Sequence, residues 1–245
     1  MSAAPLLEVQ GITKRFGGLL ANDKISFTVN QGEIVGIIGP NGSGKSTLFN
    51  CITGFYRPEG GRVLYQGRDI TRLTADRICK LGIARTFQIV QVISDMTVLE
   101  NVMTGAFLRS PSKDVARTKA EEVLRFTGLW QKRNMVATAI TIPDKKRLEV
   151  AMALATEPKL LMLDEAMAGL TPFELKEMLT LVRKVRENGI SLVIVEHVME
   201  AVMALSDRVI GINSGRKIVE DVPEKIVVNP EVIRAYLGER YHART

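Results

Sequence analysis

The chain has 245 residues, of which 46% are hydrophobic and 24% are charged, and its formal net charge is +6. These values predict one globular domain, or a domain with a subdomain. The chain has two cysteines, Cys51 and Cys79, which are too few and too far apart for a zinc cluster or a redox pair. The basic residues are scattered and aromatic residues make up only 5% of the chain, so a nucleic-acid partner is not expected.

Short apolar runs dominate the first third of the chain. Residues 6–10, 25–29 and 62–66 each read as a strand, and the short connections around them predict antiparallel pairing. Residues 34–38 are apolar throughout, which is typical of a parallel strand buried on both faces.

A glycine-rich loop follows that buried strand. It reads Gly39, Pro40, Asn41, Gly42, Ser43, Gly44, Lys45, Ser46 and Thr47, and it fits the phosphate-binding pattern Gly-x-x-x-x-Gly-Lys-Ser. Gly42 and Gly44 let the backbone approach a triphosphate, and the N–H groups at the start of the next helix favour anions. Lys45 should reach the β- and γ-phosphates and Ser46 should bind Mg²⁺, so ATP and Mg²⁺ are the expected ligands. The alternative is a chance glycine loop before a helix.

The pattern from residue 71 to about residue 155 is largely helical. The clearer segments are residues 100–108 and 115–126, with breaks near Pro111 and Gly128. Gln88 lies where the β-rich part gives way to this helical insertion. A glutamine at such a junction is able to bind Mg²⁺ weakly and to sense the γ-phosphate, although spacing alone does not decide this.

Residues 160–163 form a fully apolar run, which is typical of a buried parallel strand, and Asp164 and Glu165 follow it. Parallel strands present ligand groups at their carboxyl ends, so both acids should face the phosphate loop. Asp164 would hold Mg²⁺, and Glu165 would act as the general base that activates water. Taken alone, the two acids would be better explained as solvated residues at a strand end; the phosphate loop favours catalysis.

The last third of the chain adds a helix, a strand and a hairpin. Thr171 is expected to cap a helix, residues 191–195 form a buried strand, and residues 209–212 and 217–219 flank a turn. His197 follows the buried strand, where it would donate to the γ-phosphate or orient the attacking water. A packed or surface histidine is the alternative. His242 lies in a polar tail and is expected to be inert.

Taken together, residues 6–238 resemble the nucleotide-binding subunits of ABC transporters. Residues 41–47 match Walker A and residues 160–165 match Walker B, with Glu165 as the catalytic glutamate. The resemblance implies that Gln88 is the Q-loop glutamine, that His197 is the switch histidine and that Phe16 stacks on adenine. It also implies a D-loop made of Ala168, Gly169, Leu170 and Thr171.

Four stretches resemble more closely the importer branch for branched-chain amino acids and related amides, in particular the first of its two ATPase subunits. They are residues 14–21, 82–88, 96–102 and 232–238. This resemblance implies a second ATPase subunit, two membrane permease subunits and an extracytoplasmic solute-binding protein. It implies that residues 88–102 touch a coupling helix of the permease. Because no apolar run approaches the ~18–20 residues that span a bilayer, the chain would lie peripherally on the cytoplasmic face of the inner membrane.

The signature motif departs from this family. Where relatives carry Leu-Ser-Gly-Gly-Gln, the chain has Ile140 followed by Thr141, Ile142, Pro143 and Asp144. Pro143 removes one backbone N–H, and Asp144 adds a carboxylate close to phosphate charge. In an ABC dimer each signature completes the partner's site, so we hypothesise that the site closed by this signature is the weaker one. The alternative is that neighbouring N–H groups compensate.

These inferences predict an α/β fold with a P-loop (RecA-like), mostly parallel core sheet flanked by helices. An N-terminal antiparallel β subdomain and an inserted helical subdomain, at about residues 89–155, complete a single domain at residues 5–240, with a polar tail at residues 241–245. The alternative function is a soluble ABC-type ATPase that acts on nucleic acid or the ribosome. Such proteins usually carry two cassettes or a long coiled-coil insertion, and this chain has neither. An exporter ATPase and a non-catalytic scaffold are further alternatives.

Overall fold

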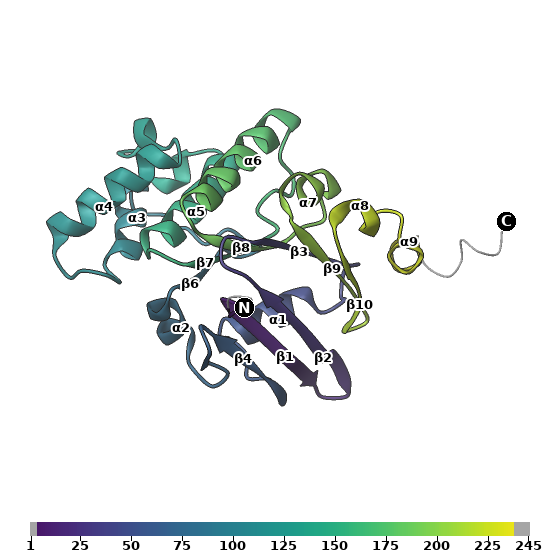
Figure 1. Cartoon of the computed structure of the whole chain (residues 1–245). Coiled ribbons are helices and arrows are strands. Elements are labelled where there is room, and N and C mark those ends of the chain that lie inside the picture. The colour runs from purple at the N-terminus through teal and green to yellow at the C-terminus, as the bar shows by residue number, and fades with distance from the viewer. Residues whose placement is uncertain (1–3, 238–245) are drawn as a thin grey trace.

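The computed structural model describes residues 4–237 and confirms the expected α/β architecture (Figure 1). A four-stranded antiparallel sheet and a six-stranded, mostly parallel sheet enclose helix α1 (Lys45–Ile52). A group of helices covers the other face of the larger sheet. The expected tail at residues 241–245, with His242, lies outside the described residues, as does Gly238 at the end of the 232–238 motif.

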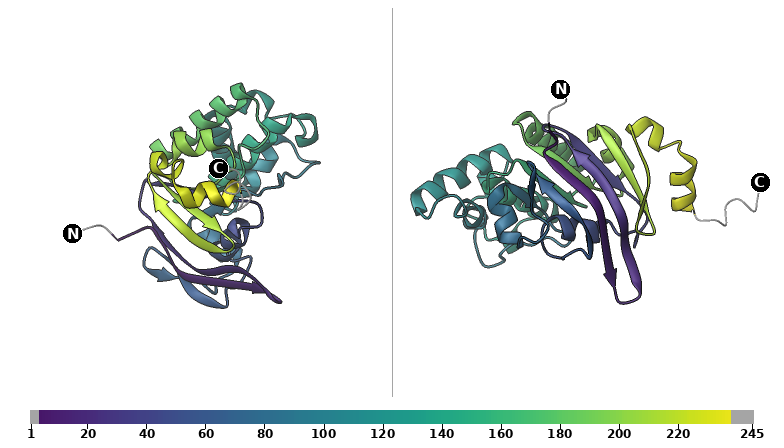
Figure 2. Two further views of the ribbon diagram at one scale, coloured as in Figure 1. Left: turned by 90° about the vertical axis from the view of Figure 1, so that its right-hand side faces the viewer. Right: turned by 60° about the horizontal axis from the view of Figure 1, so that its bottom comes forward.

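The antiparallel sheet has the order β2-β1-β4-β5. Its strands are β1 (Leu7–Phe16), β2 (Leu19–Val29), β4 (Gly60–Tyr65) and β5 (Arg68–Asp69). The first two strands form a hairpin that is much longer than the segments 6–10 and 25–29 predicted from the sequence (Figure 2). Gly11 has a φ of 61° and lies at a register shift in β1. In the sequence this glycine suggested a turn after residue 10, but the strand continues through it to Phe16. This longer hairpin carries Phe16 to its tip.

The larger sheet has the order β10-β9-β3-β8-β7-β6. All neighbouring strands are parallel except β9 and β10, which form the expected hairpin. The strands are β3 (Ile34–Ile38), β6 (Ile83–Arg85), β7 (Leu160–Asp164), β8 (Ser191–Val195), β9 (Arg208–Asn213) and β10 (Arg216–Asp221). Strand β3 lies in the middle, so the loop that follows it leaves the centre of the sheet.

Strand β6 corrects the sequence prediction, which treated residues 71–155 as largely helical. This strand pairs with β7 in parallel and places Arg85 beside Met162. Three residues with a charged one among them carry no strand periodicity, and only pairing with a buried neighbour identifies them as a strand. The consequence is that Arg85 belongs to the core sheet.

The core strands are buried on both faces, so their side chains alternate between two hydrophobic clusters. In β7, Leu161 and Leu163 pack against the helical layer, whereas Leu160 and Met162 pack against α1 and the antiparallel sheet. The helices of the first layer are α3 (Val98–Ala106), α4 (Lys113–Phe126), α5 (Ile142–Ala155) and α6 (Pro172–Glu187). Because both faces are apolar, polar groups are confined to the strand ends.

The remaining helices are short. They are α2 (Ala75–Leu81), α7 (Met199–Leu205), α8 (Pro223–Ile226) and α9 (Pro230–Leu237), with 3₁₀ turns at Trp130–Lys132 and Ala137–Ala139. Thr171 caps α6 through a reciprocal capping box with Glu174, as the sequence predicted. None of the helices within residues 4–237 has the length and apolar character that crossing a bilayer requires.

We predict that Gly105→Ala destabilises the fold. A Cβ at this position in α3 would lie 2.3 Å from the Met152 carbonyl oxygen of α5, and a backbone atom within a packed helix does not move cheaply. The expected loss is about 1–3 kcal/mol in the free energy of unfolding, measured by urea denaturation. Gly18→Ala is the control, because an added Cβ there meets no atom within 4 Å. An unfolding midpoint for Gly105→Ala at or above that of the unchanged chain would contradict this.

Candidate functional site

The phosphate loop depends on two close backbone approaches. A Cβ on Gly44 would lie 2.2 Å from the Ala21 carbonyl oxygen of β2, and the φ of Gly44 is 103°. A Cβ on Gly39 would lie 2.1 Å from the Ile212 carbonyl oxygen of β9. Both positions therefore require glycine, for contacts that the sequence pattern does not reveal.

Lys45 is the buried first residue of α1. Its ammonium group donates to the carbonyl oxygens of Gly39, at 2.7 Å, and Pro40, at 2.9 Å. Burial lowers the pKa of Lys45, and the nearby carboxylates of Glu165 and Asp164 oppose that shift. In this arrangement the lysine charge is held inside the loop that it would use to bind phosphate.

A cleft of about 570 Å³ opens over the loop, a size that suits a nucleotide. The ring of Phe16, 43% exposed, lies at its edge, and Tyr56 meets that ring edge-on with centroids 5.2 Å apart. The cleft thus joins the predicted adenine-stacking residue to the phosphate loop. Its lining residues are Phe16, Leu19, Leu20, Ala21, Asn41, Gly42, Ser43, Gly44, Lys45, Ser46, Thr47, Gln88, Glu165, Ser214 and Gly215.

Asp164 is 2% exposed at the end of β7. Its Oδ2 accepts a hydrogen bond from Arg85 at 3.0 Å, while its Oδ1 is buried without a hydrogen-bond partner among the described residues. Burial raises the pKa of Asp164, and the Arg85 guanidinium opposes that rise. An unpartnered carboxylate oxygen suits Mg²⁺, which takes few protein ligands and completes its shell with phosphates and water.

Glu165 has a left-handed backbone, with a φ of 52°, which is uncommon for a residue with a side chain. Its carboxylate accepts a hydrogen bond from Gln88 Nε2 at 3.0 Å and lies 2.6 Å from His197 Nε2. The structure therefore brings together three residues that the sequence placed on separate segments. The backbone turn at Glu165 sends the two adjacent acids to different partners.

The predicted D-loop and the residues just before it are held by two charged side chains that the sequence analysis missed. Lys146 of α5 donates to the carbonyl oxygens of Glu165, at 3.2 Å, and Ala168, at 2.6 Å. Glu196 accepts from the backbone N–H of Met167 at 2.8 Å, and burial raises its pKa to about 7. Helix α5 is thereby connected directly to the segment that carries the predicted catalytic glutamate.

The signature residues lie apart from the cleft, at the exposed N-terminus of α5. Thr141 caps this helix, and its hydroxyl also donates to Asp144 at 2.7 Å. Lys132 forms an ion pair with the same carboxylate. Burial alone would raise the pKa of Asp144, but Lys132 and Thr141 outweigh it and the net shift is downward. The helix start is thus closed by its own side chains, and Pro143 contributes no N–H.

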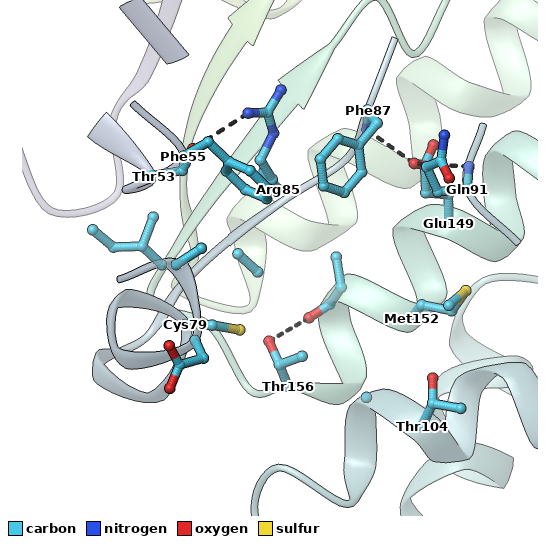
Figure 3. Close-up of a pocket in the computed structure, with 16 residues that line it drawn as sticks. Thr53, Phe55, Cys79, Arg85, Phe87, Gln91, Thr104, Glu149, Met152 and Thr156 are labelled. Atoms are coloured by element: carbon cyan, nitrogen blue, oxygen red, sulfur yellow. Dashed lines mark hydrogen bonds between the residues drawn. The ribbon is translucent and has the colours of Figure 1, made fainter. Parts of the chain in front are cut away.

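A second cleft, of about 350 Å³, lies between the core sheet and the helical layer (Figure 3). Arg85 lies there beside the Phe87 ring, 4.6 Å from its centroid. Glu149 of α5 accepts hydrogen bonds from the backbone N–H groups of Phe87, at 2.9 Å, and Gln91, at 3.4 Å. Burial raises the pKa of Glu149 to about 7. This carboxyl holds the segment around Gln88 against α5.

Sequence reasoning assigned no role to Arg85, Lys146, Glu149 or Glu196. Arg85, Glu149 and Glu196 are charged residues within or beside an apolar run, and a charge in such a place indicates a buried partner. Lys146 lies in the charged run from Asp144 to Arg147, where nothing distinguishes it from its neighbours. For the first three residues that signal was present in the sequence. The partners were not, because three of the four contact backbone groups of segments far away along the chain.

Comparisons with known proteins identify the same family over most of the chain. Family models described as "ABC transporter" and "Branched-chain amino acid ATP-binding cassette transporter" match residues 22–168 and 216–242. The chain is 41% identical to the high-affinity branched-chain amino acid transport ATP-binding protein LivG of Salmonella typhimurium, over 96% of this chain and 98% of that protein. It is 39% identical, with the same coverage, to the high-affinity branched-chain amino acid transport ATP-binding protein BraF of Pseudomonas aeruginosa.

Solved structures give the same result. This chain superposes with a TM-score of 0.88 on a solved structure of the ADP conformation of an ATP-binding cassette of an ABC transporter. The two sequences are 33% identical, and the match covers 97% of this chain and all of that one. A nucleotide-free ATP-binding cassette from an ABC transporter superposes with the same TM-score and identity.

The raised pKa of Glu149 generates a prediction about pH. With a pKa of about 7 in the folded chain against an ordinary value of 4.5, Glu149 binds more proton in the folded than in the unfolded state between those values. Its contribution to stability therefore falls as pH rises through about 7. Glu149→Gln keeps an oxygen acceptor for both N–H groups and does not titrate. The unchanged chain should therefore lose stability relative to the Glu149→Gln variant as pH rises. We expect the free energy of unfolding of the variant minus that of the unchanged chain to increase by about 3 kcal/mol from about pH 5 to about pH 8.

The measurement is urea unfolding across that pH range. Glu187→Gln, on the exposed end of α6, is the matched control and should follow the unchanged chain at every pH. A difference for Glu149→Gln that stays constant with pH would show that this carboxyl does not titrate in the window.

Proposed function

This chain belongs to the ATP-binding subunits of ABC transporters, and we propose that it is the ATPase of an importer for branched-chain amino acids or related small amino acid and amide solutes. ATP binding and hydrolysis follow from the family. The solute class rests on one observation, which is near-complete coverage at 41% identity by proteins described as branched-chain amino acid transport ATP-binding proteins. The match of residues 216–242 to the model described for that branch adds support.

The residues that we propose for catalysis already lie together around Glu165. Glu165 would accept the proton of the attacking water as general base. His197 and Gln88 contact its carboxylate, at 2.6 Å and 3.0 Å. Lys45 would exchange the carbonyl oxygens of Gly39 and Pro40 for phosphate oxygens, which are better partners for an ammonium group.

Phe16, Asp164 and Ser46 complete the proposed site. Phe16 would stack on the adenine ring at the mouth of the cleft. Asp164, through its unpartnered Oδ1, and Ser46 would hold Mg²⁺, with Gln88 as a weaker ligand. When bound, Mg²⁺ would neutralise part of the charge on the phosphate oxygens.

We predict that Glu165→Gln lowers the rate of ATP hydrolysis by about 100-fold or more, because the amide does not accept a proton from water. ATP binding should be retained, since the change leaves the phosphate loop intact. The measurement is phosphate release by the assembled transporter, with a parallel equilibrium ATP titration. Glu200→Gln, on the exposed face of α7, is the matched control. Hydrolysis by Glu165→Gln at the control rate would remove Glu165 from the role of general base.

The proposed partners are a second ATPase subunit, two permease subunits and an extracytoplasmic solute-binding protein. The cleft beside the segment around Gln88 fits a segment of a permease, because it is apolar and lies between the core sheet and the helical layer. Phe87 and Gln91 line it, and both are fastened to α5 through Glu149. A part of the permease bound in this cleft would contact Phe87 and Gln91, which flank Gln88. We propose that this contact holds the chain on the cytoplasmic face of the membrane.

The signature geometry supports an asymmetric dimer. Of the signature residues, Pro143 has no N–H and the Asp144 N–H is directed to Thr141, 3.4 Å away. The Thr141 hydroxyl is directed to Asp144. Few donors remain for a phosphate of the facing subunit. We propose that the site built on this chain's Lys45 and Glu165 hydrolyses ATP with the second subunit's signature, while the reciprocal site is weaker.

We predict that Pro143→Gly changes how hydrolysis by the purified chain depends on protein concentration. The unchanged chain should stay near the Glu165→Gln background, because self-dimers would lack a competent signature. Pro143→Gly restores an N–H, so its activity should rise faster than linearly with concentration, several-fold above background. Restoring one charge-assisted hydrogen bond of about 1.5–3 kcal/mol is sufficient for that.

Pro111→Gly, in the exposed loop before α4, is the control for the general effect of replacing a proline. Superlinear hydrolysis by the unchanged chain would show that its signature is competent, and the asymmetric mechanism would then be dropped.

A further inference from the structure

The C-terminal part of the chain contacts the phosphate loop at two places. The hydroxyl of Tyr236, on α9, accepts a hydrogen bond from the backbone N–H of Gly39 at 2.9 Å. In the turn between β9 and β10, the N–H of Gly215 donates to the Ser43 carbonyl oxygen at 3.0 Å. These contacts reach the first residue and the middle of the loop, so the segment beyond β8 spans it.

Helix α9 is anchored at the end of the strand that feeds the loop. Val232, 6% exposed, belongs to a small buried cluster that includes Ile38, Val209 and Ile226. Ile38 is the residue immediately before Gly39. Gly211 in β9 leaves room for Val219 of β10, which packs against the same cluster, because a Cβ on Gly211 would come 2.7 Å from Val219 Cγ1. The tyrosine hydroxyl is therefore presented from a packed element and not from a free tail.

The two polar groups of Gly39 have different partners. Its carbonyl oxygen accepts from Lys45, the residue that would turn toward phosphate when a nucleotide binds. Its N–H is buried and is directed to Tyr236, the partner that residues 4–237 provide for it. The tyrosine contact does not compete with phosphate, so it persists while the lysine contact changes. Loss of the hydroxyl would leave a buried donor without a partner.

We propose that Tyr236 is a positioning residue of the phosphate loop, through which the C-terminal helix keeps the loop in the shape that a nucleoside triphosphate requires. This inference rests on nucleotide binding at that loop. A loop that is held in its bound shape loses less conformational freedom on binding, and its affinity is correspondingly higher. Tyr236 lies within residues 216–242, which the branched-chain family model matches, so the proposal gives one residue of that region a role in nucleotide binding.

The test compares Tyr236→Phe with Tyr65→Phe in the full chain. Both variants lose only a hydroxyl, and that of Tyr65 contacts the Gly82 carbonyl oxygen, far along the chain from the loop. The dissociation constant for ATP is measured by equilibrium titration, and kcat and KM are measured in the assembled transporter. Amide hydrogen exchange of the segment 34–45 reports directly on the Gly39 N–H.

We expect Tyr236→Phe to raise the dissociation constant for ATP about three- to tenfold, which corresponds to one net hydrogen bond. The KM should rise with it, kcat should stay within about twofold, and the segment 34–45 should exchange faster. Tyr65→Phe should match the unchanged chain in ATP affinity and in exchange of that segment.

Three results would overturn the proposal: an ATP affinity of Tyr236→Phe equal to or tighter than that of the unchanged chain, an equal loss in Tyr65→Phe, or unchanged exchange of segment 34–45. The unchanged chain is titrated first. Its failure to bind ATP would overturn the ATPase function together with this inference, whereas normal binding with an unaffected Tyr236→Phe overturns this inference alone.

Discussion

Burial of the core strands on both faces is the constraint on which the site depends. Strands β3, β7 and β8 carry apolar side chains toward α1 on one side and toward the helical layer on the other. Polar chemistry is therefore confined to the strand ends, and parallel pairing brings those ends to one edge. Gly39, Asp164 and His197 come together there because they follow three neighbouring strands.

Helix α5 connects parts of the site that lie far apart along the chain. It holds the segment around Gln88 through Glu149 and the D-loop through Lys146, and its first turn is the signature. A displacement of this helix would reach Glu165 by two routes, through Gln88 and through the D-loop carbonyls. The permease contact proposed for the second cleft would act on the same helix, so one rigid element would link the partner to the chemistry.

Segments from the two ends of the chain meet beside the nucleotide cleft, where the N–H of Asp23 in β2 donates to the Gly215 carbonyl oxygen at 2.8 Å. The long β1–β2 hairpin carries Phe16 to the cleft, and the Ala21 carbonyl oxygen closes on Gly44. The C-terminal hairpin and α9 contact the loop as well, at Ser43 and Gly39. The loop is thus shaped by segments about 200 residues apart in the sequence, and its own residues determine only which conformations are sterically open to it.

The sequence by itself determined the fold class, the phosphate loop, the acidic pair and the capped helix α6, because each depends on local spacing and periodicity. It also predicted His197 from its position after a buried strand, whereas the role predicted for Gln88 depended on the family resemblance, because spacing alone did not decide it. Only the tertiary structure decided that β6 is a strand, that Glu149 and Lys146 hold distant loops, and that Tyr236 meets Gly39. The physical reason is that a buried charge or hydroxyl needs a partner, but the partner is a backbone group whose position exists only after the strands have paired.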